Sequence, residues 1–345
     1  LCGASLAAVL ACGIPGVAQA DDRYWDANGT AVGSGGTGTW NLANLNWSPN
    51  GDGVSGPFVE PWDNGDVDNA IFGGTAGTVT VGVPVTVGNI TFSSAGYVLS
   101  GSKITLSGPA STITTNFGNA SVAINSTIDG SSGLIKAGGS HLILNGVNSF
   151  TGGITINAGS IYAASDAALG ALSNNIATAA AANVRLSIGG AGTARTVTIG
   201  DGGNLILEGA GAGSARIRGN GSVQLAASGV TMSNDLSDYT GRTVFTACNG
   251  TCSTRFTSIG NLGEASSLGA PVTVADGTIV FSQSSQYSDS IIYLGDGDSS
   301  NRNWDINGDA GLVRNQGTGT LEITGDVDIS VGGGFYAETA DIRLL

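Results

Sequence analysis

The feature that most constrains this chain is a two-residue alternation of aliphatic side chains, written in short runs between Gly, Asn or Asp. Such alternation places every second residue on the same face of an extended backbone. It recurs at Val79, Val81, Val83, Val85 and Val87, and in the pairs Leu142 and Leu144, Ile154 and Ile156, Leu205 and Leu207, Val272 and Val274, and Leu321 and Ile323. The pattern therefore predicts many short strands, each with one buried face.

The composition supports an all-β fold and excludes several classes of function. Glycine accounts for 58 of the 345 residues, and Gly is among the poorest helix formers. Hydrophobic residues make up 41% of the chain, which is enough to bury a core, whereas only 11% of residues are charged. The net charge of −14 leaves no basic surface for a nucleic-acid backbone, so nucleic acid is not an expected partner.

Three stretches of the sequence return in altered form later in the chain. They are SFTGGITI (149–156) as DYTGRTVF (238–245), AALGA (167–171) as SLGAPVTVADGTIVF (267–281), and GLIKAGGSHLILNG (133–146) as GLVRNQGTGTLEITG (311–325). Units that cannot bury an aliphatic face alone do so by stacking on their neighbours, which predicts a solenoid. At about 20–25 residues per coil, residues 71–345 would form on the order of twelve coils. The Ala-rich stretch 176–183 is expected to be a loop rather than a short helix.

Residues 21–70 differ from the rest of the chain, because they hold four of the five tryptophans: Trp25, Trp40, Trp47 and Trp62. The open end of a solenoid presents unpaired strand edges and bare core, so it needs a cover. We therefore predict an N-terminal aromatic-rich cap over 21–70, followed by the solenoid over 71–345. A tryptophan platform that binds carbohydrate is the functional alternative.

The first twenty residues are largely apolar and end in Ala18-Gln19-Ala20, which is typical of a secretory signal peptide. This pattern predicts cleavage between Ala20 and Asp21, and hence export. A lipobox with Cys12 as the lipidated residue is the rival interpretation. In an oxidising compartment the remaining cysteines, Cys248 and Cys252, are expected to form a local disulfide, worth at most roughly 1–2 kcal/mol because its loop is short.

The stretch 133–161 resembles the autotransporter-associated β-strand repeat of passenger domains, which are the exported parts of self-exporting outer-membrane proteins. The matching residues are Gly133, Leu134, Lys136, Gly138, Leu142, Leu144, Gly146, Asn148, Gly152, Thr155, Ile156 and Gly159. The resemblance implies a right-handed parallel β-helix at, or shed from, a Gram-negative cell surface or outer membrane. It also implies export through a C-terminal outer-membrane barrel that is not present in this chain. Because the chain stops at DIRLL in mid-pattern, we expect either a truncated passenger or a separate exporter.

Candidate catalytic and metal-binding residues are few. His141 is the only histidine, and its parity is opposite to that of Leu142 and Leu144, so it should face solvent. A metal site is not expected around a single histidine, and a catalytic role would need a serine and an acid from distant coils. We therefore predict no catalytic, metal or cofactor-binding residue.

Paired carboxylates are the one remaining motif of a glycan-active enzyme, which needs two acids about 5–10 Å apart. Such i, i+2 pairs are Asp66 with Asp68, Asp296 with Asp298, and Asp326 with Asp328. Each lies in or near a Gly- and Asn-rich stretch, where Asp is expected in turns. The stretch 295–309 is also a cation candidate, but it has Asn307 where a calcium loop needs an acid, so a long turn is expected there.

The sequence predicts an exported, surface-displayed β-solenoid passenger that acts as a structural stalk or adhesin rather than as an enzyme, and that needs no cofactor. Its expected partners are ligands on host cells, matrix or neighbouring cells. A secreted glycan-active enzyme on the same scaffold and a self-associating extracellular fibre subunit remain as alternatives.

Overall fold

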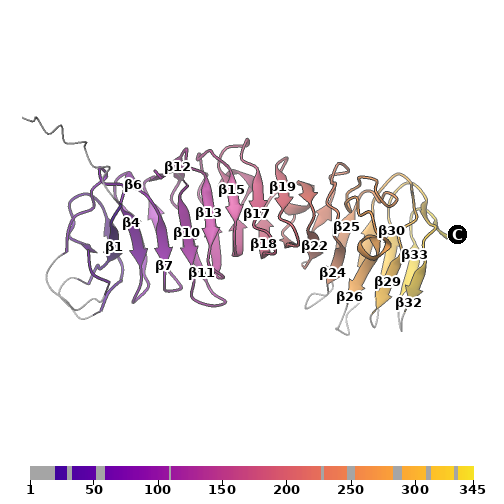
Figure 1. The fold of residues 1–345 in the computed structure, drawn as a ribbon, viewed down its shortest axis with the longest axis horizontal. Coiled ribbons are helices and arrows are strands. Elements are labelled where there is room, and N and C mark those ends of the chain that lie inside the picture. Colours follow the sequence, from indigo (N-terminus) through magenta and orange to yellow (C-terminus); the bar gives the residue numbers. More distant parts are fainter. Residues whose placement is uncertain are drawn as a thin grey trace, which may run out of the picture.

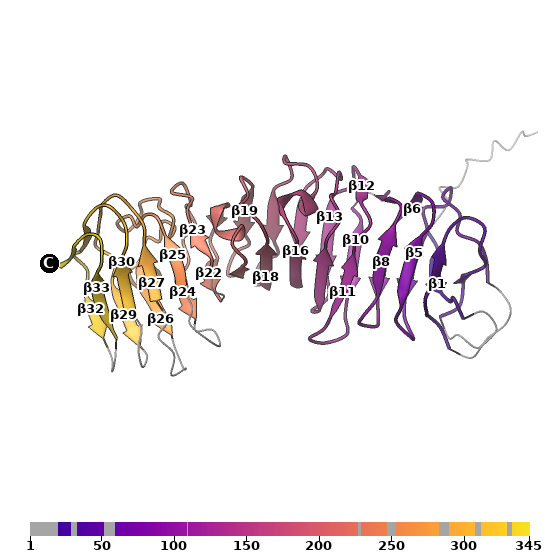
Figure 2. The ribbon, with the colours of Figure 1, turned by 180° about the vertical axis from the view of Figure 1, so that it is seen from behind.

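The computed structural model describes residues 20–28, 33–51, 59–108, 110–226, 229–246, 253–282, 290–307, 312–329 and 333–345. Strands stack along one long axis, with the N-terminal and C-terminal parts at opposite ends of the rod (Figure 1 and, from behind, Figure 2). The described part has three short helical segments, η1 (Asp166–Leu169), η2 (Ala212–Ser214) and α1 (Val274–Gly277). The predicted all-β parallel solenoid is confirmed, with about eleven turns.

Two long sheets run along the rod. The first has thirteen parallel strands in the order β2 (Gly38–Trp40), β5 (Thr78–Val81), β8 (Val98–Gly101), β11 (Ser121–Ile124), β14 (His141–Leu144), β16 (Gly159–Ala163), β18 (Asn183–Ile188), β20 (Asn204–Glu208), β22 (Ser222–Leu225), β24 (Thr243–Thr246), β26 (Ile279–Ser282), β29 (Trp304–Asn307) and β32 (Val327–Ile329). The second has ten strands in the order β21 (Arg216–Gly219), β19 (Thr196–Ile199), β17 (Ile176–Thr178), β15 (Ile154–Ile156), β13 (Leu134–Ala137), β10 (Thr112–Thr115), β7 (Ile90–Phe92), β4 (Asn69–Phe72), β1 (Asp22–Trp25) and β3 (Trp47–Ser48).

Three shorter sheets complete the turns. They are β12 (Ile128–Gly130), β9 (Ile104–Leu106) and β6 (Val85–Val87); β23 (Thr231–Met232), β25 (Ser253–Phe256), β27 (Ser290–Tyr293), β30 (Leu312–Asn315) and β33 (Gly334–Ala337); and β28 (Asp298–Ser300), β31 (Leu321–Ile323) and β34 (Ile342–Leu344). Successive strands in the early turns, such as β5, β6 and β7, belong to three different sheets, and so do β29, β30 and β31 near the C-terminus. The turns at both ends of the rod therefore have three sides.

The register of the sheets stacks aliphatic side chains on aliphatic side chains along the core. In the thirteen-stranded sheet Leu142 pairs with Ile161, Ile161 with Leu186, and Leu186 with Leu207, and all four side chains are fully buried. Full burial of each such side chain contributes about 1.5–3 kcal/mol. The aliphatic alternation thus supplies one continuous core in which every turn covers the next.

The N-terminal end is closed by an aromatic cluster. Trp25, Trp40, Trp47 and Trp62 are all at most 2% exposed, and their closest ring centroids lie 4.7 to 5.2 Å apart. Phe72 continues the cluster and stacks on Phe92 of the next turn at 5.1 Å. Because the tryptophan faces are buried against one another, they offer no platform to a sugar, and the carbohydrate alternative is wrong for these residues.

The alternation fails at three predicted core positions. Val83 is 37% exposed, because it lies with Gly82 and Pro84 in the turn between β5 and β6, and the buried alternation continues at Val85. Val272 and Val274 are 68% and 57% exposed. They flank the start of α1, where the side chain of Thr273 caps the helix by accepting a hydrogen bond from the backbone N–H of Asp276.

Two stretches predicted to be loops contain strands. Residues 176–183 begin with β17 and end at the first residue of β18, and the turn between them is made possible by Ala181 at a φ of 54°. In 295–309 the turn ends early, because β28 starts at Asp298 and β29 follows at Trp304. In both places hydrogen bonds to the neighbouring turns of the solenoid form strands, although Ala, Gly and Asp are residues with a low propensity for strands.

Two of the three sequence repeats share one backbone hydrogen bond, although their strands β15 and β24 belong to different sheets. The backbone N–H of Ala171 donates to the carbonyl of Phe150, and that of Ala270 donates in the same way to Tyr239. The third repeat is out of phase, because Lys136 points into the core whereas Arg314, its counterpart in the sequence, points outward. Alignment by residue type therefore mispaired these two strands by one residue.

Buried cations hold several corners of the solenoid. The fully buried Lys136 Nζ donates to the carbonyls of Ala137, Gly138 and Ala158, at 2.7, 2.6 and 3.2 Å. Burial lowers the pKa of Lys136 to about 8. Arg195 and Arg302, which are 2% and 0% exposed, likewise donate to backbone carbonyls of preceding turns. Carbonyls that turn away from the sheets at the corners thus obtain donors inside the protein.

Candidate functional site

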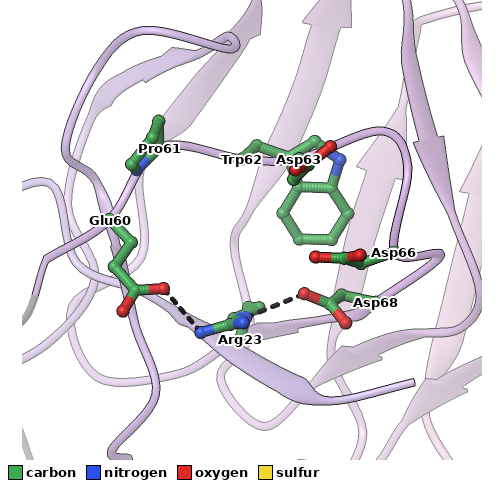
Figure 3. A pocket seen from close by; sticks show the side chains of 7 residues that line it. All are labelled: Arg23, Glu60, Pro61, Trp62, Asp63, Asp66 and Asp68. Atoms are coloured by element: carbon green, nitrogen blue, oxygen red, sulfur yellow. Dashed lines mark hydrogen bonds and ion pairs between the residues drawn. The ribbon is translucent and has the colours of Figure 1, made fainter. Parts of the chain in front are cut away.

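The cap contains a pocket of about 210 Å³ between β1 and the segment that leads into β4. It is lined by Arg23, Glu60, Pro61, Trp62, Asp63, Asp66 and Asp68 (Figure 3). Trp62 is fixed by its indole N–H, which donates to the carbonyl of Thr86 at 3.0 Å. The lining thus contains four carboxylates and one guanidinium, in a recess against the aromatic cluster.

Arg23 bridges two of these carboxylates. Its Nε donates to Asp68 Oδ2 and its Nη1 donates to Glu60 Oε2, each at 2.8 Å (Figure 3). The hydrogen bond to Asp68 is the main reason that the pKa of Arg23 lies above its ordinary value. The other oxygen of Asp68 accepts the backbone N–H of Asp21 at 2.9 Å. Both oxygens of Asp68 are thus engaged by the protein itself.

The predicted pair Asp66 and Asp68 does line one pocket, but its members are not equivalent. Asp66 is exposed, whereas Asp68 is 3% exposed. The residue between them, Val67, has a φ of 54°, so the backbone is not a strand and the same-face rule for i, i+2 residues does not apply. With Asp68 committed to Arg23 and Asp21, the pocket holds an ion pair rather than an acid–base couple for glycan cleavage.

The other two carboxylate pairs do not form paired sites either. Asp298 accepts a hydrogen bond from the hydroxyl of Tyr293 at 2.8 Å, and burial raises its pKa, whereas Asp296 is exposed. Asp326 and Asp328 are both exposed on the surface at β32. In the described parts of the chain, no three His, Cys, Asp or Glu side chains lie close enough together to hold a metal ion.

His141 faces outward from β14, as its parity predicts, and neighbouring turns supply contacts that the sequence did not reveal. Its Nδ1 lies 3.1 Å from Ser160 Oγ and its Nε2 lies 2.8 Å from Asn119 Oδ1. The ring also makes an edge contact with Tyr162 at 5.5 Å. Partial burial, and then the nearby positive charges of Arg185 and Lys136, lower the pKa of His141, so the ring is neutral at pH 7.

A shallow recess of about 320 Å³ lies beside this histidine on the outer face of the thirteen-stranded sheet. Its lining includes His141, Ser160, Asn183 and Arg185. Ser160 is only 4% exposed as a residue, and its hydroxyl oxygen lies 3.1 Å from Nδ1 of His141. The recess is therefore a polar surface suited to binding, and its members come from successive turns about twenty residues apart.

Two predicted features lie outside the described residues. Cys248 and Cys252 fall in the gap between 246 and 253, so their disulfide remains a prediction. The expected leader also lies outside, up to residue 19, whereas Ala20 and Asp21 are described and exposed. Cleavage between Ala20 and Asp21 likewise remains a prediction.

Comparison with known proteins agrees with this fold. Residues 134–161, which span β13 to β16, match the family model of the passenger-associated-transport-repeat. The stacked parallel turns and this repeat support a β-solenoid passenger segment similar to those of autotransporters. Passengers of this class are exported to the cell surface or released outside the cell, and the predicted localisation is thereby confirmed.

The similarity extends far beyond the repeat. The chain is 48% identical over 341 residues, 96% of its length, to the adhesin BmaC autotransporter of Brucella suis biovar 1 (strain 1330). It spans about 10% of the length of that curated relative. No solved structure matches the chain. Within the described residues, no helix has the length and apolar character needed to cross a membrane.

Proposed function

We propose that this chain is a stalk and adhesive segment of a surface-displayed passenger. The observation that carries the proposal is the 48% identity, over nearly the whole chain, to a protein named as an adhesin. The fold supports it, because stacked turns give length to a rod while leaving its outer faces free for contact. The same likeness supports a non-enzymatic role as part of this proposal, and Asp68 of the one pair that lines a pocket is already bound to Arg23 and Asp21.

We place the contact surface at the recess beside His141. A neutral imidazole, the phenol ring of Tyr162 and the ion pair between Arg185 and Glu208 lie together on one outward face. These groups can both donate and accept hydrogen bonds, and the rings add flat apolar area. Such a surface suits polar ligands rich in hydroxyl groups on a host cell, the matrix or a neighbouring cell.

The test is an attachment assay with the chain displayed on a non-adherent bacterium. The variant His141→Ala/Arg185→Ala removes two outward groups of the recess, while Arg216→Ala/Arg218→Ala removes two outward arginines from the ten-stranded sheet as a matched control. We expect attachment to fall severalfold only in the first variant, with unchanged far-UV circular dichroism in both. Equal attachment by both variants would refute this contact surface, and no attachment by the wild-type chain to any tested surface would refute the adhesive role.

A further inference from the structure

Asp21 is the residue that would begin the chain after cleavage, and both its backbone N–H and its backbone carbonyl are hydrogen-bonded to the segment 68–69. Its N atom lies 2.9 Å from Asp68 Oδ1, and its carbonyl accepts the backbone N–H of Asn69 at 2.8 Å. The next residue, Asp22, is already in register with Asn69 as β1 pairs with β4. The start of β1 is therefore held at a fixed position against the segment that carries Asp68.

The carboxylate of Asp68 is buried, although the residue lies in the segment just before β4. Asp68 is 3% exposed, and among the described residues its one cationic contact is Arg23, which also pairs with Glu60 and Asp21. Asp63 and Asp66 line the same pocket, so its lining holds four carboxylates and one guanidinium (Figure 3). A second positive charge beside Asp68 Oδ1 would balance a buried anion that a neutral amide N–H only partly compensates.

We propose that Asp68 is the binding site for the chain's own α-ammonium group, formed when the leader is removed. Hydrolysis adds one water across the peptide bond between Ala20 and Asp21. The released leader keeps the Ala20 carboxylate, and the amine of Asp21 takes up a proton. The hydrogen bond to Asp68 Oδ1 then becomes an ion pair without any movement of β1, so that processing locks the cap.

The charges that face the new ammonium favour this pairing. Asp68 is in direct contact, and the side chain of Asp21 supplies a further carboxylate, which lies 3.8 Å from Arg23 Nη2. Arg23 opposes the pairing as a like charge, but Glu60 and Asp68 both neutralise it at 2.8 Å. Asp63 and Asp66 add negative potential from the pocket. The balance is attractive, and burial of Asp68 reduces screening by solvent.

The first experiment compares the chain that begins at Asp21 with the same chain extended by Ala20. Each is isotope-labelled at the N-terminal amine by reductive methylation and titrated by NMR. An unpaired α-amine titrates near 7.7–8.0. We expect the Asp21 amine to titrate about one unit higher, whereas the amine of the extended chain, displaced from Asp68, titrates at the ordinary value. Equal titration of the two amines would overturn the proposal.

A second measurement separates the ion pair from a general effect of Asp68 on folding. Asp68→Asn should abolish the upward shift of the amine, whereas Asp66→Asn, in the same pocket, should leave most of it. The thermal stability gained on removing Ala20 should be full below pH 7.7 and disappear as the pH rises through the raised pKa of the amine. N-terminal sequencing of exported protein must give Asp21, and any other start would overturn the proposal. Neither result depends on attachment, so failure here is distinguishable from failure of the adhesive role.

Discussion

The two lysines of this chain provide a matched test of what holds a solenoid corner together. Lys136 is fully buried and donates to three carbonyls, whereas Lys103, whose side chain is 44% exposed, forms an ion pair with Asp129. Lys136→Met keeps much of the volume but leaves three carbonyl oxygens without this donor, at a cost of 1–3 kcal/mol for each buried group that stays unsatisfied. Relief from burying an ammonium offsets part of that cost.

The expected net loss for Lys136→Met is about 2–4 kcal/mol in the free energy of unfolding. For Lys103→Met the expected loss is about 0–1 kcal/mol, because exposed ion pairs contribute little. Thermal unfolding followed by far-UV circular dichroism should therefore show a Tm lower by roughly 3–6 °C in the first variant. If the two variants unfold at the same temperature, the hydrogen bonds of Lys136 do not stabilise this corner of the solenoid and the reasoning is wrong.

Three further perturbations test the same physical account. Burial holds the pKa of Lys136 near 8, whereas in the unfolded chain it is about 10.5. The free energy of unfolding should therefore rise between about pH 8 and 10.5, because the unfolded chain binds more protons there. Urea titrations at several pH values should show this rise in the wild-type chain and not in Lys136→Met. Leu207 is fully buried, so Leu207→Ala should lower the free energy of unfolding by about 2–5 kcal/mol. Leu172 is 79% exposed, so Leu172→Ala should lower it by less than about 0.5 kcal/mol. Equal urea midpoints for the two variants would contradict this. Gly138 has a φ of +74°, and a Cβ there would overlap the carbonyl oxygen of Thr115, so Gly138→Ala should lower Tm by more than Leu172→Ala does.

Much of the fold could be predicted from the sequence, because each strand carries its own alternation. Leu142, Leu205 and Leu321 are buried as the pattern requires. The prediction failed where a turn or a short helix interrupted the extended chain, as the turn that contains Val83 and the capped helix that begins at Val274 did. Periodicity reports which face a residue shares with its neighbours, but it does not report where a turn or a short helix interrupts the run.

The candidate surface was harder to predict for a different reason. Asn119 and Ser160 meet His141 because β11, β14 and β16 stack in one register, and that register depends on the lengths of the loops between them. The separations of 22 and 19 residues on the two sides of His141 are unequal. No fixed period in the sequence can therefore bring these partners together.

The repeat motif is best understood through the neighbours that its residues contact. Asn148 accepts the backbone N–H of Ile128 in one turn and donates to the carbonyl of Ala168 in another, at 2.7 and 2.6 Å. Lys136 likewise reaches the carbonyl of Ala158 in the next turn. These inward residues join successive turns, so they maintain the rod and are closed to ligands.

The contact with ligands that we propose must then fall on the residues of opposite parity. In β14 the outward side chains of His141 and Ile143 alternate with the buried Leu142 and Leu144. Tyr162 of β16 pairs with Ile143 and points outward in the same way. Because the two sets alternate along one strand, outward residues can change without disturbing the stack. Substitutions on the outer face should therefore alter attachment while leaving Tm unchanged, whereas substitutions at the inward motif positions should lower Tm first.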